Sequence, residues 1–329
     1  MAKSARSSAH LLFTILALYA MTGVAAPKKR PASAPSDPPL KLRSRSSSTT
    51  ITTDGAPAAT PARKPDPRNF RQLGDGELPI ASKGAIVIDS CTGQPLYEKN
   101  ADELRYPAST TKIMTALLVI EAGDLDREVE ITLEDSKVGE SSLSLRPGEY
   151  YTRRDMLFGL MLKSANDVAH ALGRDNAGTA EAFAEKMTRR ARELGATNTS
   201  FMNANGLHHP QHFTTPRDLA AISRAAMQQP YFRQVVGTQR YQWRRPNGEV
   251  WALSNHNRLL GTFPGTTGLK TGYTNPSQQV LASACLRDRR EVIAVTMYAF
   301  RPNNWEDSRL LLTYGLENPP SGQPVPRFP

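Results

Sequence analysis

A serine and a lysine three residues apart, in Ser109-Thr110-Thr111-Lys112, could together perform nucleophilic chemistry. They stand at the start of a predicted helix over 110–121, where residues i and i+3 share one face, so the Lys112 amine can reach the Ser109 hydroxyl. A serine hydroxyl is a poor nucleophile until a base removes its proton, and a lysine can be that base when burial and a second cation lower its pKa. Alone, the pattern is more often an N-cap region with a solvated lysine.

A second polar group, Ser164-Ala165-Asn166, falls in a predicted turn between helices over 153–162 and 167–172. There the Ser164 hydroxyl could pass on a proton, and the Asn166 carboxamide could hold a substrate amide. Serine and asparagine are also ordinary capping residues, so this group by itself says little.

A third group, Lys270-Thr271-Gly272, lies in a predicted strand over 268–273. Glycine lets another backbone approach a strand closely, so a peptide could add there as an extra strand, with Lys270 and Thr271 facing its terminal carboxylate. The alternative is an edge strand protected by a lysine. The three groups occur in this order, and each lies on the type of element that the chemistry needs. This combination arises by chance much more rarely than any one group alone. It therefore indicates serine acyl transfer.

Strands at both ends of the folded region and helices between them must position these groups. Strands are predicted over 84–89 and 95–98, joined in a hairpin, and over 268–273, 279–286 and 291–299. Helices are predicted over 110–121, 153–162, 167–172, 179–194, 216–227 and 305–312, with short β-like pieces at 129–131 and 143–145. This order predicts an α/β (α+β) fold, in which a sheet carries an inserted all-helical lobe and a cleft lies between the two.

The net charge of +10 over 329 residues is unevenly distributed. Residues 1–70 carry eleven Lys and Arg against three Asp, so the remainder holds 30 basic and 28 acidic residues and is nearly neutral. The folded part therefore lacks the basic surface that nucleic-acid binding requires, and no nucleic-acid partner is predicted.

The N-terminal region is typical of an exported protein. Lys3 and Arg6, an apolar run over 11–21 and small residues before a cut after Ala25 predict a signal peptide over 1–25, with an uncleaved anchor as the alternative. Residues 26–77, rich in Pro, Ser and Arg, are expected to be a disordered linker that could weakly contact anionic wall polymer or a membrane surface. We expect a catalytic domain over 78–316, a disordered tail over 317–329, and a location in the periplasm or cell envelope.

Three histidines, His208, His209 and His212, lie around Pro210 and raise the question of a metal site. Pro210 prevents a helical pair of ligands and no carboxylate cluster lies beside them, so we expect a polar loop instead. No metal and no cofactor are predicted.

Longer segments of the chain resemble the D-alanyl-D-alanine carboxypeptidases, the low-molecular-mass penicillin-binding proteins of serine peptidase family S11. The similarity runs from about Leu78 to Leu316, and its segments are 107–117, 146–152, 191–199 and 257–260. The resemblance implies a β-lactamase/transpeptidase-like fold with a five-stranded antiparallel sheet. It also implies a serine acyl-enzyme, peptidoglycan stem peptides ending in D-Ala-D-Ala as substrates, and β-lactams as inhibitors.

The resemblance also implies roles for particular residues. Ser109 would be the nucleophile and Lys112 the general base, while the backbone N–H groups of Ser109 and Tyr273 would form an oxyanion hole. The implied catalytic residues are Ser109, Lys112 and Ser164, and the implied substrate-binding residues are Asn166, Lys270, Thr271, Gly272 and Tyr273.

Three features depart from the family pattern. Pro276-Ser-Gln-Gln279 replaces a usual Ala-Gly pair and is one residue shorter. Asn304 stands where many members have an arginine for the substrate carboxylate, with Arg301 nearby as a candidate substitute. The β-rich domain and amphipathic helix that follow in many relatives are not expected.

The departures leave open a D,D-endopeptidase that cuts cross-links with the same residues. A class A β-lactamase is disfavoured because no Glu-x-x-Leu-Asn segment follows Asn166. A non-catalytic wall-binding protein is disfavoured because all the motif side chains are intact.

The implied strand order also predicts the state of Cys91 and Cys285. The first strand would pair with the strand over 291–299, and the strand over 279–286 would lie one further out, so the two cysteines would be two strand spacings apart. At about 4.8 Å per spacing this is roughly 9–10 Å, whereas a disulfide requires Cα atoms within about 7 Å. We therefore expect two free thiols.

Overall fold

The computed structural model describes residues 77–319. The predicted signal peptide, nearly all of the predicted linker and most of the predicted tail lie outside the described residues. Their boundaries therefore stay predictions.

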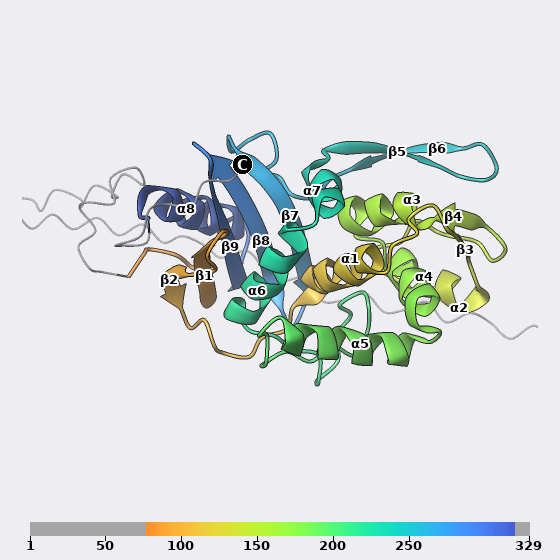
Figure 1. Ribbon diagram of the computed structural model, residues 1–329, viewed down its shortest axis with the longest axis horizontal. Coiled ribbons are helices and arrows are strands. Elements are labelled where there is room, and N and C mark those ends of the chain that lie inside the picture. The colour runs from red at the N-terminus through yellow and green to blue at the C-terminus, as the bar shows by residue number, and fades with distance from the viewer. Residues whose placement is uncertain (1–76, 320–329) are drawn as a thin grey trace, which may run out of the picture. The chain divides into compact units, whose positions relative to one another are not determined.

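A five-stranded antiparallel sheet with the strand order β2-β1-β9-β8-β7 forms one part of the described chain (Figure 1). Within this sheet β7 is an edge strand, hydrogen-bonded to β8 on one side. The predicted strands of this sheet are confirmed. So is the predicted place of the strand over 291–299, between the strands over 84–89 and 279–286. The strands are β1 (Gly84–Asp89), β2 (Pro95–Lys99), β7 (Thr266–Thr274), β8 (Gln278–Arg287) and β9 (Arg290–Ala299).

Helices cover both faces of this sheet, and successive side chains of a strand enter different cores because they point to opposite faces. In β1, Ile86 belongs to the larger core, to which α6 (Pro216–Met227) contributes. Its neighbour Val87 belongs to a smaller core with Leu311 and Leu312 of α8 (Asn303–Glu317). Figure 1 shows α8 and α6 on opposite sides of the sheet.

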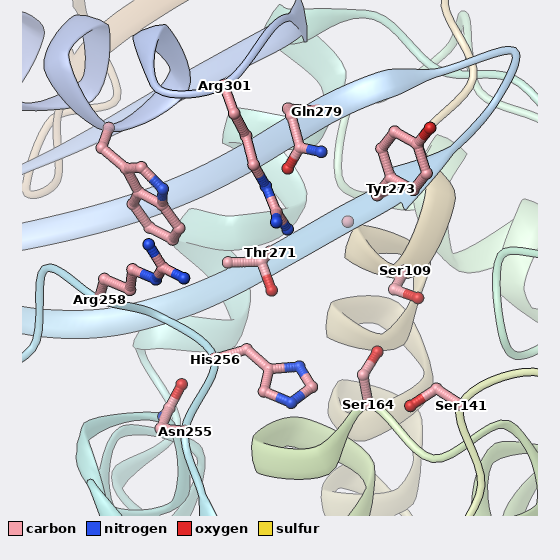
Figure 2. A pocket seen from close by; sticks show the side chains of 12 residues that line it. Ser109, Ser141, Ser164, Asn255, His256, Arg258, Thr271, Tyr273, Gln279 and Arg301 are labelled. Carbon is pink, nitrogen blue, oxygen red and sulfur yellow. The ribbon is translucent and has the colours of Figure 1, made fainter.

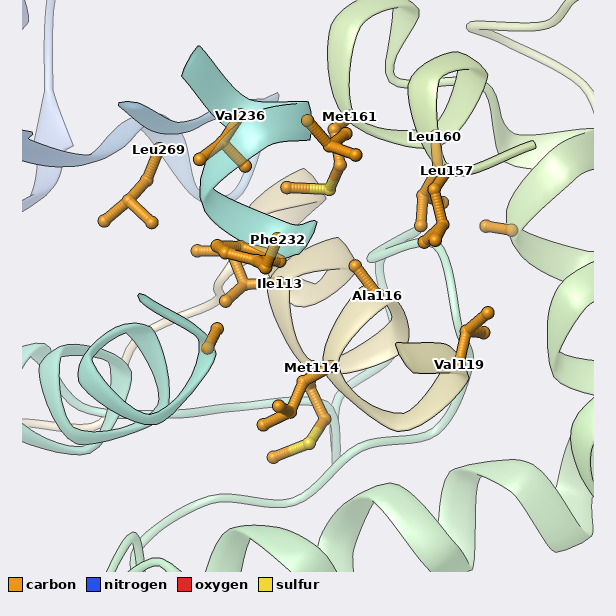
Figure 3. Close-up of a cluster of buried hydrophobic side chains, with 14 of the residues drawn as sticks. Ile113, Met114, Ala116, Val119, Leu157, Leu160, Met161, Phe232, Val236 and Leu269 are labelled. Carbon is orange, nitrogen blue, oxygen red and sulfur yellow. The ribbon is translucent and has the colours of Figure 1, made fainter. Parts of the chain in front are cut away.

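Helix α1 (Lys112–Glu121) runs through the larger core and follows the 3-10 turn η2 (Ala108–Thr111). Its side chains from Lys112 to Val119 are all buried, as expected for a helix that is apolar on nearly every side. Figure 3 shows Ile113 close to Phe232 of α7 (Pro230–Gly237), with Met114 and Val119 pointing elsewhere. The sequence predicts one helix over 110–121, whereas α-helical geometry starts at Lys112.

The inserted lobe is not all-helical, which corrects the prediction. Besides helices it contains two small antiparallel sheets, β3 with β4 and β5 with β6. Its helices are α2 (Leu133–Ser136), α3 (Arg153–Phe158), the π-helical turn η3 (Gly159–Lys163), α4 (Asn166–Ala177) and α5 (Ala180–Glu193). Its strands are β3 (Glu128–Glu130), β4 (Tyr150–Thr152), β5 (Arg240–Arg244) and β6 (Val250–Ser254).

The prediction of a β-like piece at 143–145 is wrong. The N–H groups of Leu143 and Leu145 donate to the buried Asp167 carboxylate at 3.1 Å instead of to a neighbouring strand. Sequence reasoning also missed α7 and the β5–β6 hairpin. The hairpin is held by tertiary packing, because Trp243 is fully buried and its ring lies 4.7 Å from that of Tyr151.

Threonine caps set several helix starts in the lobe and beside the sheet. Thr215 accepts from the Asp218 N–H at 3.1 Å, with Pro216 at the first helical position, so α6 begins where the sequence predicts. Thr152 and Thr179 cap α3 and α5 in the same way. Over the described range, no helix combines the length and the apolar character needed to span a bilayer.

Cys91 and Cys285 are both free thiols, as predicted. Cys285 lies in β8 opposite Val292 of β9, and Val292 is in turn opposite Asp89 of β1. The intervening strand β9 therefore separates the two cysteines.

Candidate active site

Ser109 and Lys112 lie within hydrogen-bond reach at the junction of η2 and α1. Lys112 Nζ lies 3.1 Å from Ser109 Oγ, in a hydrogen bond that a protonated lysine donates and a neutral lysine accepts. Ser109 lies in η2 and lines the cavity, while Lys112 is the first residue of α1 and its side chain is buried in the core. The predicted nucleophile–base pair is thus brought together by two adjoining helical turns.

Lys112 has two further partners, and both are obligate acceptors. Its Nζ donates to Asn166 Oδ1 at 2.7 Å and to the Asn205 carbonyl at 2.6 Å. A neutral amine has two N–H groups and one lone pair. These two oxygens can use both N–H groups, which leaves the lone pair for the proton of the Ser109 hydroxyl.

The surroundings of Lys112 favour this neutral form. The side chain is fully buried, and burial together with the positive charge of Lys270 holds the pKa of Lys112 well below its ordinary value. The negative charges of Asp167 and Glu140 raise the pKa of Lys112, but by less than burial and Lys270 lower it. A lysine with a lowered pKa can act as a general base near neutral pH.

The loop over 203–206 supplies the Asn205 carbonyl, and Gly206 lets it approach. Gly206 has φ +86°, and a Cβ there would lie 1.9 Å from the carbonyl oxygen of Ala108 in η2. The Asn203 side chain closes the turn by accepting from the Gly206 N–H at 2.7 Å. Sequence reasoning missed this loop, although its Asn-Gly pair is a turn signal.

Ser164 and Asn166 face the site from the lobe, as the sequence predicts for an inter-helix turn. Ser164 ends the π-helical turn η3 with a left-handed φ of 63°, and Asn166 begins α4. The Asn166 carboxamide is fixed by a second bond, from Nδ2 to the Gly139 carbonyl at 3.0 Å. π-Helical turns and left-handed non-glycine residues concentrate at functional sites, because such strained geometry aims a side chain.

Strand β7 passes directly beside the nucleophile because residue 272 is a glycine. A Cβ on Gly272 would lie 2.9 Å from the backbone nitrogen of Ser109. The next residue is Tyr273, whose N–H is the second predicted oxyanion donor. A carbonyl group bound between these two nitrogens would lie along the free edge of β7, where a peptide can add as a strand.

A cavity of about 430 Å³ joins these groups (Figure 2). Figure 2 shows Ser109, Ser164 and Ser141 together at one end, and Arg258, Arg301 and His256 around Thr271 at the other. The lining residues are Ser109, Ser141, Ser164, Asn255, His256, Arg258, Thr271, Gly272, Tyr273, Gln279, Arg301 and Trp305.

Lys270 takes a different place from the one predicted. It is 1% exposed, and its Nζ donates to the Thr271 carbonyl at 2.9 Å. Burial lowers the pKa of Lys270 to about 7. Thr271 itself lines the cavity, so Lys270 acts on the site through its charge and its support of β7, while Thr271 presents the hydroxyl.

The candidate substitute arginine, Arg301, lines the cavity, whereas Asn304 is buried in the first turn of α8. Sequence reasoning missed Ser141, His256, Arg258 and Trp305, which come from loops and α8. Arg258 lies in the segment 257–260, which is part of the resemblance to the carboxypeptidase family. That resemblance was the only sequence signal that could have pointed to Arg258 as a site residue.

The three histidines of the 208–212 loop do not form a shared site. His212 is buried, its Nδ1 accepts from the Met202 N–H at 3.2 Å, and its Nε2 lies 2.9 Å from Thr111 Oγ1. Burial lowers the pKa of His212 to about 3, so the ring is neutral and braces η2. Between residues 77 and 319, no group of three or more His, Cys, Asp or Glu side chains could hold a metal ion.

A serine activated by a buried lysine, two backbone donors for an oxyanion and an open strand edge define a serine acyl-transfer enzyme of the penicillin-binding class. Residues 72–301 match the model of the family described as D-alanyl-D-alanine carboxypeptidase, and the chain belongs to that family of serine peptidases.

Characterised relatives agree with this assignment. The chain is similar to the D-alanyl-D-alanine carboxypeptidase DacF of Bacillus subtilis, with 35% identity over 69% of this chain and 59% of the relative. It is 33% identical to DacB2 of Mycobacterium tuberculosis, over 73% of this chain and 85% of the relative. The crystal structure of the Streptomyces K15 DD-transpeptidase matches with a TM-score of 0.69 and 33% identity, covering 72% of this chain and 98% of that one. The chain thus spans less than two thirds of the Bacillus protein, but nearly all of the Streptomyces structure.

Proposed function

We propose that this protein is a serine-type D-alanyl-D-alanine carboxypeptidase that trims peptidoglycan stem peptides through an acyl-enzyme on Ser109. The observation that carries the proposal is the contact of Lys112 Nζ with Ser109 Oγ at 3.1 Å, in a site where both N–H groups of a neutral lysine have acceptors. The family and the named relatives support the same activity.

In the first step, Ser109 Oγ attacks the carbonyl carbon between the two D-alanines and its proton passes to Lys112. The N–H groups of Ser109 and Tyr273 stabilise the negative oxygen. The C–N bond then breaks, and the departing amine takes a proton from Lys112, with the Ser164 hydroxyl as relay. In the second step, water attacks the ester carbonyl and gives a proton to Lys112. The bond from the carbonyl carbon to Ser109 Oγ then breaks, Lys112 returns the proton to Oγ, and the shortened peptide leaves.

The terminal carboxylate of the substrate needs a cation and a hydroxyl next to the scissile bond. With the peptide antiparallel to β7 and its carbonyl at Tyr273, the carboxylate lies at Thr271. Figure 2 shows the Arg301 guanidinium directed towards Thr271. We assign carboxylate binding to this pair, because a charged hydrogen bond is stronger than a neutral one. β-Lactams carry a comparable carboxylate and amide and would bind in the same way.

The signal-peptide pattern supports export, with action in the periplasm or cell envelope. The basic segment over 26–77 would contact anionic wall polymer or a membrane surface weakly. Mass spectrometry of the mature N-terminus, combined with cell fractionation, tests this part of the proposal.

Digestion of purified muropeptides tests the reaction. Monomeric pentapeptides should lose one D-alanine, while cross-linked dimers should stay joined, and Ser109→Ala should do neither. Cleavage of dimers without release of D-alanine from monomers would instead establish the endopeptidase alternative.

A further inference from the structure

We infer that Arg258 forms a second anion subsite beyond Thr271, which selects leaving residues that carry a second carboxylate. The inference rests on the proposed function, because it concerns the residue that this reaction releases. Arg258 would therefore determine specificity rather than take part in bond breaking.

The cavity continues past the group that receives the terminal carboxylate. Its lining includes Arg258 and Trp305 as well as Thr271 and Arg301. Figure 2 shows Arg258 and Arg301 approaching Thr271 from different sides. Because Arg301 and Thr271 suffice for one carboxylate, the space at Arg258 can receive a further group of the leaving residue.

The charges of the lining favour an anion there. Arg258 and Arg301 both line the cavity, and none of the described lining residues is an aspartate or glutamate. Within residues 77–319 the Arg258 guanidinium makes no hydrogen bond or ion pair, and its main-chain carbonyl alone accepts, from Thr262 Oγ1 at 2.5 Å. A cation in a cleft of one sign, without a counterion, raises the local concentration of anions.

The loop that carries Arg258 is fixed by its own side chains. The Asn257 N–H donates to Asn255 Oδ1 at 2.9 Å, and the Leu259 N–H donates to Asn257 Oδ1 at 3.1 Å. Asn257 and Leu259 are buried. The backbone of Arg258 is therefore held in place, which lowers the entropic cost of using its side chain to bind a ligand.

A D-dicarboxylic amino acid at the leaving position satisfies both arginines. Its main-chain carboxylate would bind Thr271 and Arg301, and its side-chain carboxylate would reach Arg258. The chemistry is unchanged, because the same C–N bond breaks and the same amine takes the proton.

Three N-acylated peptides test the inference, ending in D-Ala-D-Ala, D-Ala-D-Glu and D-Ala-D-Gln. The last two differ in charge but hardly in shape, so the ratio of their kcat/KM values isolates the second carboxylate. The wild-type protein should prefer D-Glu over D-Gln by about fivefold, which is the upper range for a partly exposed ion pair. Arg258→Gln should bring this ratio to about one, and Arg258→Lys should restore part of it.

Arg189→Gln is the matched control, because Arg189 is an exposed arginine of α5 outside this cavity. It makes the same change in net charge and should leave the ratio unchanged. A wild-type ratio of one, or a preference that survives Arg258→Gln, would overturn the inference while D-Ala-D-Ala is still cleaved. Failure to cleave D-Ala-D-Ala would count against the proposed function instead.

Discussion

The two ends of the cavity differ in the burial and the hydrogen bonding of their basic side chains. At the serine end, Lys112 is fully buried and every hydrogen-bonding position of its neutral amine has a partner. At the arginine end, Arg258 and Arg301 are exposed, and their guanidinium groups make no hydrogen bond or ion pair with any residue between 77 and 319. The first end is organised in advance for proton transfer, whereas the second is completed by the ligand.

This contrast predicts different sensitivities to substitution. Changes at the serine end should reduce the chemical step for every substrate and inhibitor, because its geometry serves the transition state. Changes at the arginine end should act on binding and depend on the charge of the ligand.

The largest effect should come from Lys112→Arg, which keeps the positive charge but removes the base, since a guanidinium is always protonated. Acylation by benzylpenicillin should slow by roughly 10²–10⁴-fold, the usual contribution of a general base. Stopped-flow fluorescence measures this rate, with Lys137→Arg, an exposed lysine after α2, as the control. An unchanged rate in Lys112→Arg would show that another group takes the proton.

The same experiment has a pH dependence with a defined sign. Only neutral Lys112 can accept the Ser109 proton, so the acylation rate should rise with pH until Lys112 is deprotonated. Because burial and Lys270 lower the pKa of Lys112, this rise should end well below the ordinary range of lysine. A rate that climbs only where free lysine titrates would contradict a buried, neutral base.

A smaller effect is expected for Gly272→Ala. The added Cβ would lie 2.9 Å from the Ser109 nitrogen, so β7 must move away from the oxyanion hole. Acylation should fall by about 10²-fold, in line with the loss of one oxyanion donor. Gly248→Ala, in the turn between β5 and β6 and outside the cavity, is the control, because a Cβ there has nothing within 4 Å. Equal rates for the two variants would place the oxyanion elsewhere.

The smallest effect should be that of Arg301→Gln. It should raise KM for a D-Ala-D-Ala peptide about fivefold, because an exposed ion pair contributes modestly, and should change kcat little. A peptide with an amidated terminal D-alanine lacks the charge, so its kcat/KM should be the same for both proteins. An equal loss with both peptides would show that Arg301 does not read the carboxylate.

The serine end could be predicted from sequence because its residues come in short motifs. Ser109 and Lys112 are one helical turn apart, and Ser164 and Asn166 flank a turn, so local geometry alone brings each pair into reach. The buried position of Lys270 was not predicted, because which face of a strand turns inward depends on the neighbouring elements. The hydrogen bond from Lys112 to the Asn205 carbonyl was not predicted either, because it joins two segments that are far apart in the sequence.

The arginine end could not be predicted from short motifs, because its residues are far apart in the sequence. Arg258 comes from the loop before β7, Arg301 from the turn between β9 and α8, and Trp305 from α8. Similarly, the main sheet follows from apolar strand patterns, whereas the β5–β6 hairpin depends on Trp243 packing against Tyr151 of another segment. Tertiary contacts between distant residues determine these features, and one sequence carries little signal for them.

Mass spectrometry of the intact protein after reaction with benzylpenicillin tests the acyl-enzyme most directly. The protein should gain the mass of one penicilloyl group, and peptide mapping should place it on Ser109. The Ser109→Ala variant should gain none, while Ser136→Ala, a serine of α2 whose hydroxyl donates to the Leu133 carbonyl, should react like the wild type. Undiminished labelling of Ser109→Ala, or a penicilloyl group mapped to another residue, would contradict the assignment of Ser109 as the nucleophile.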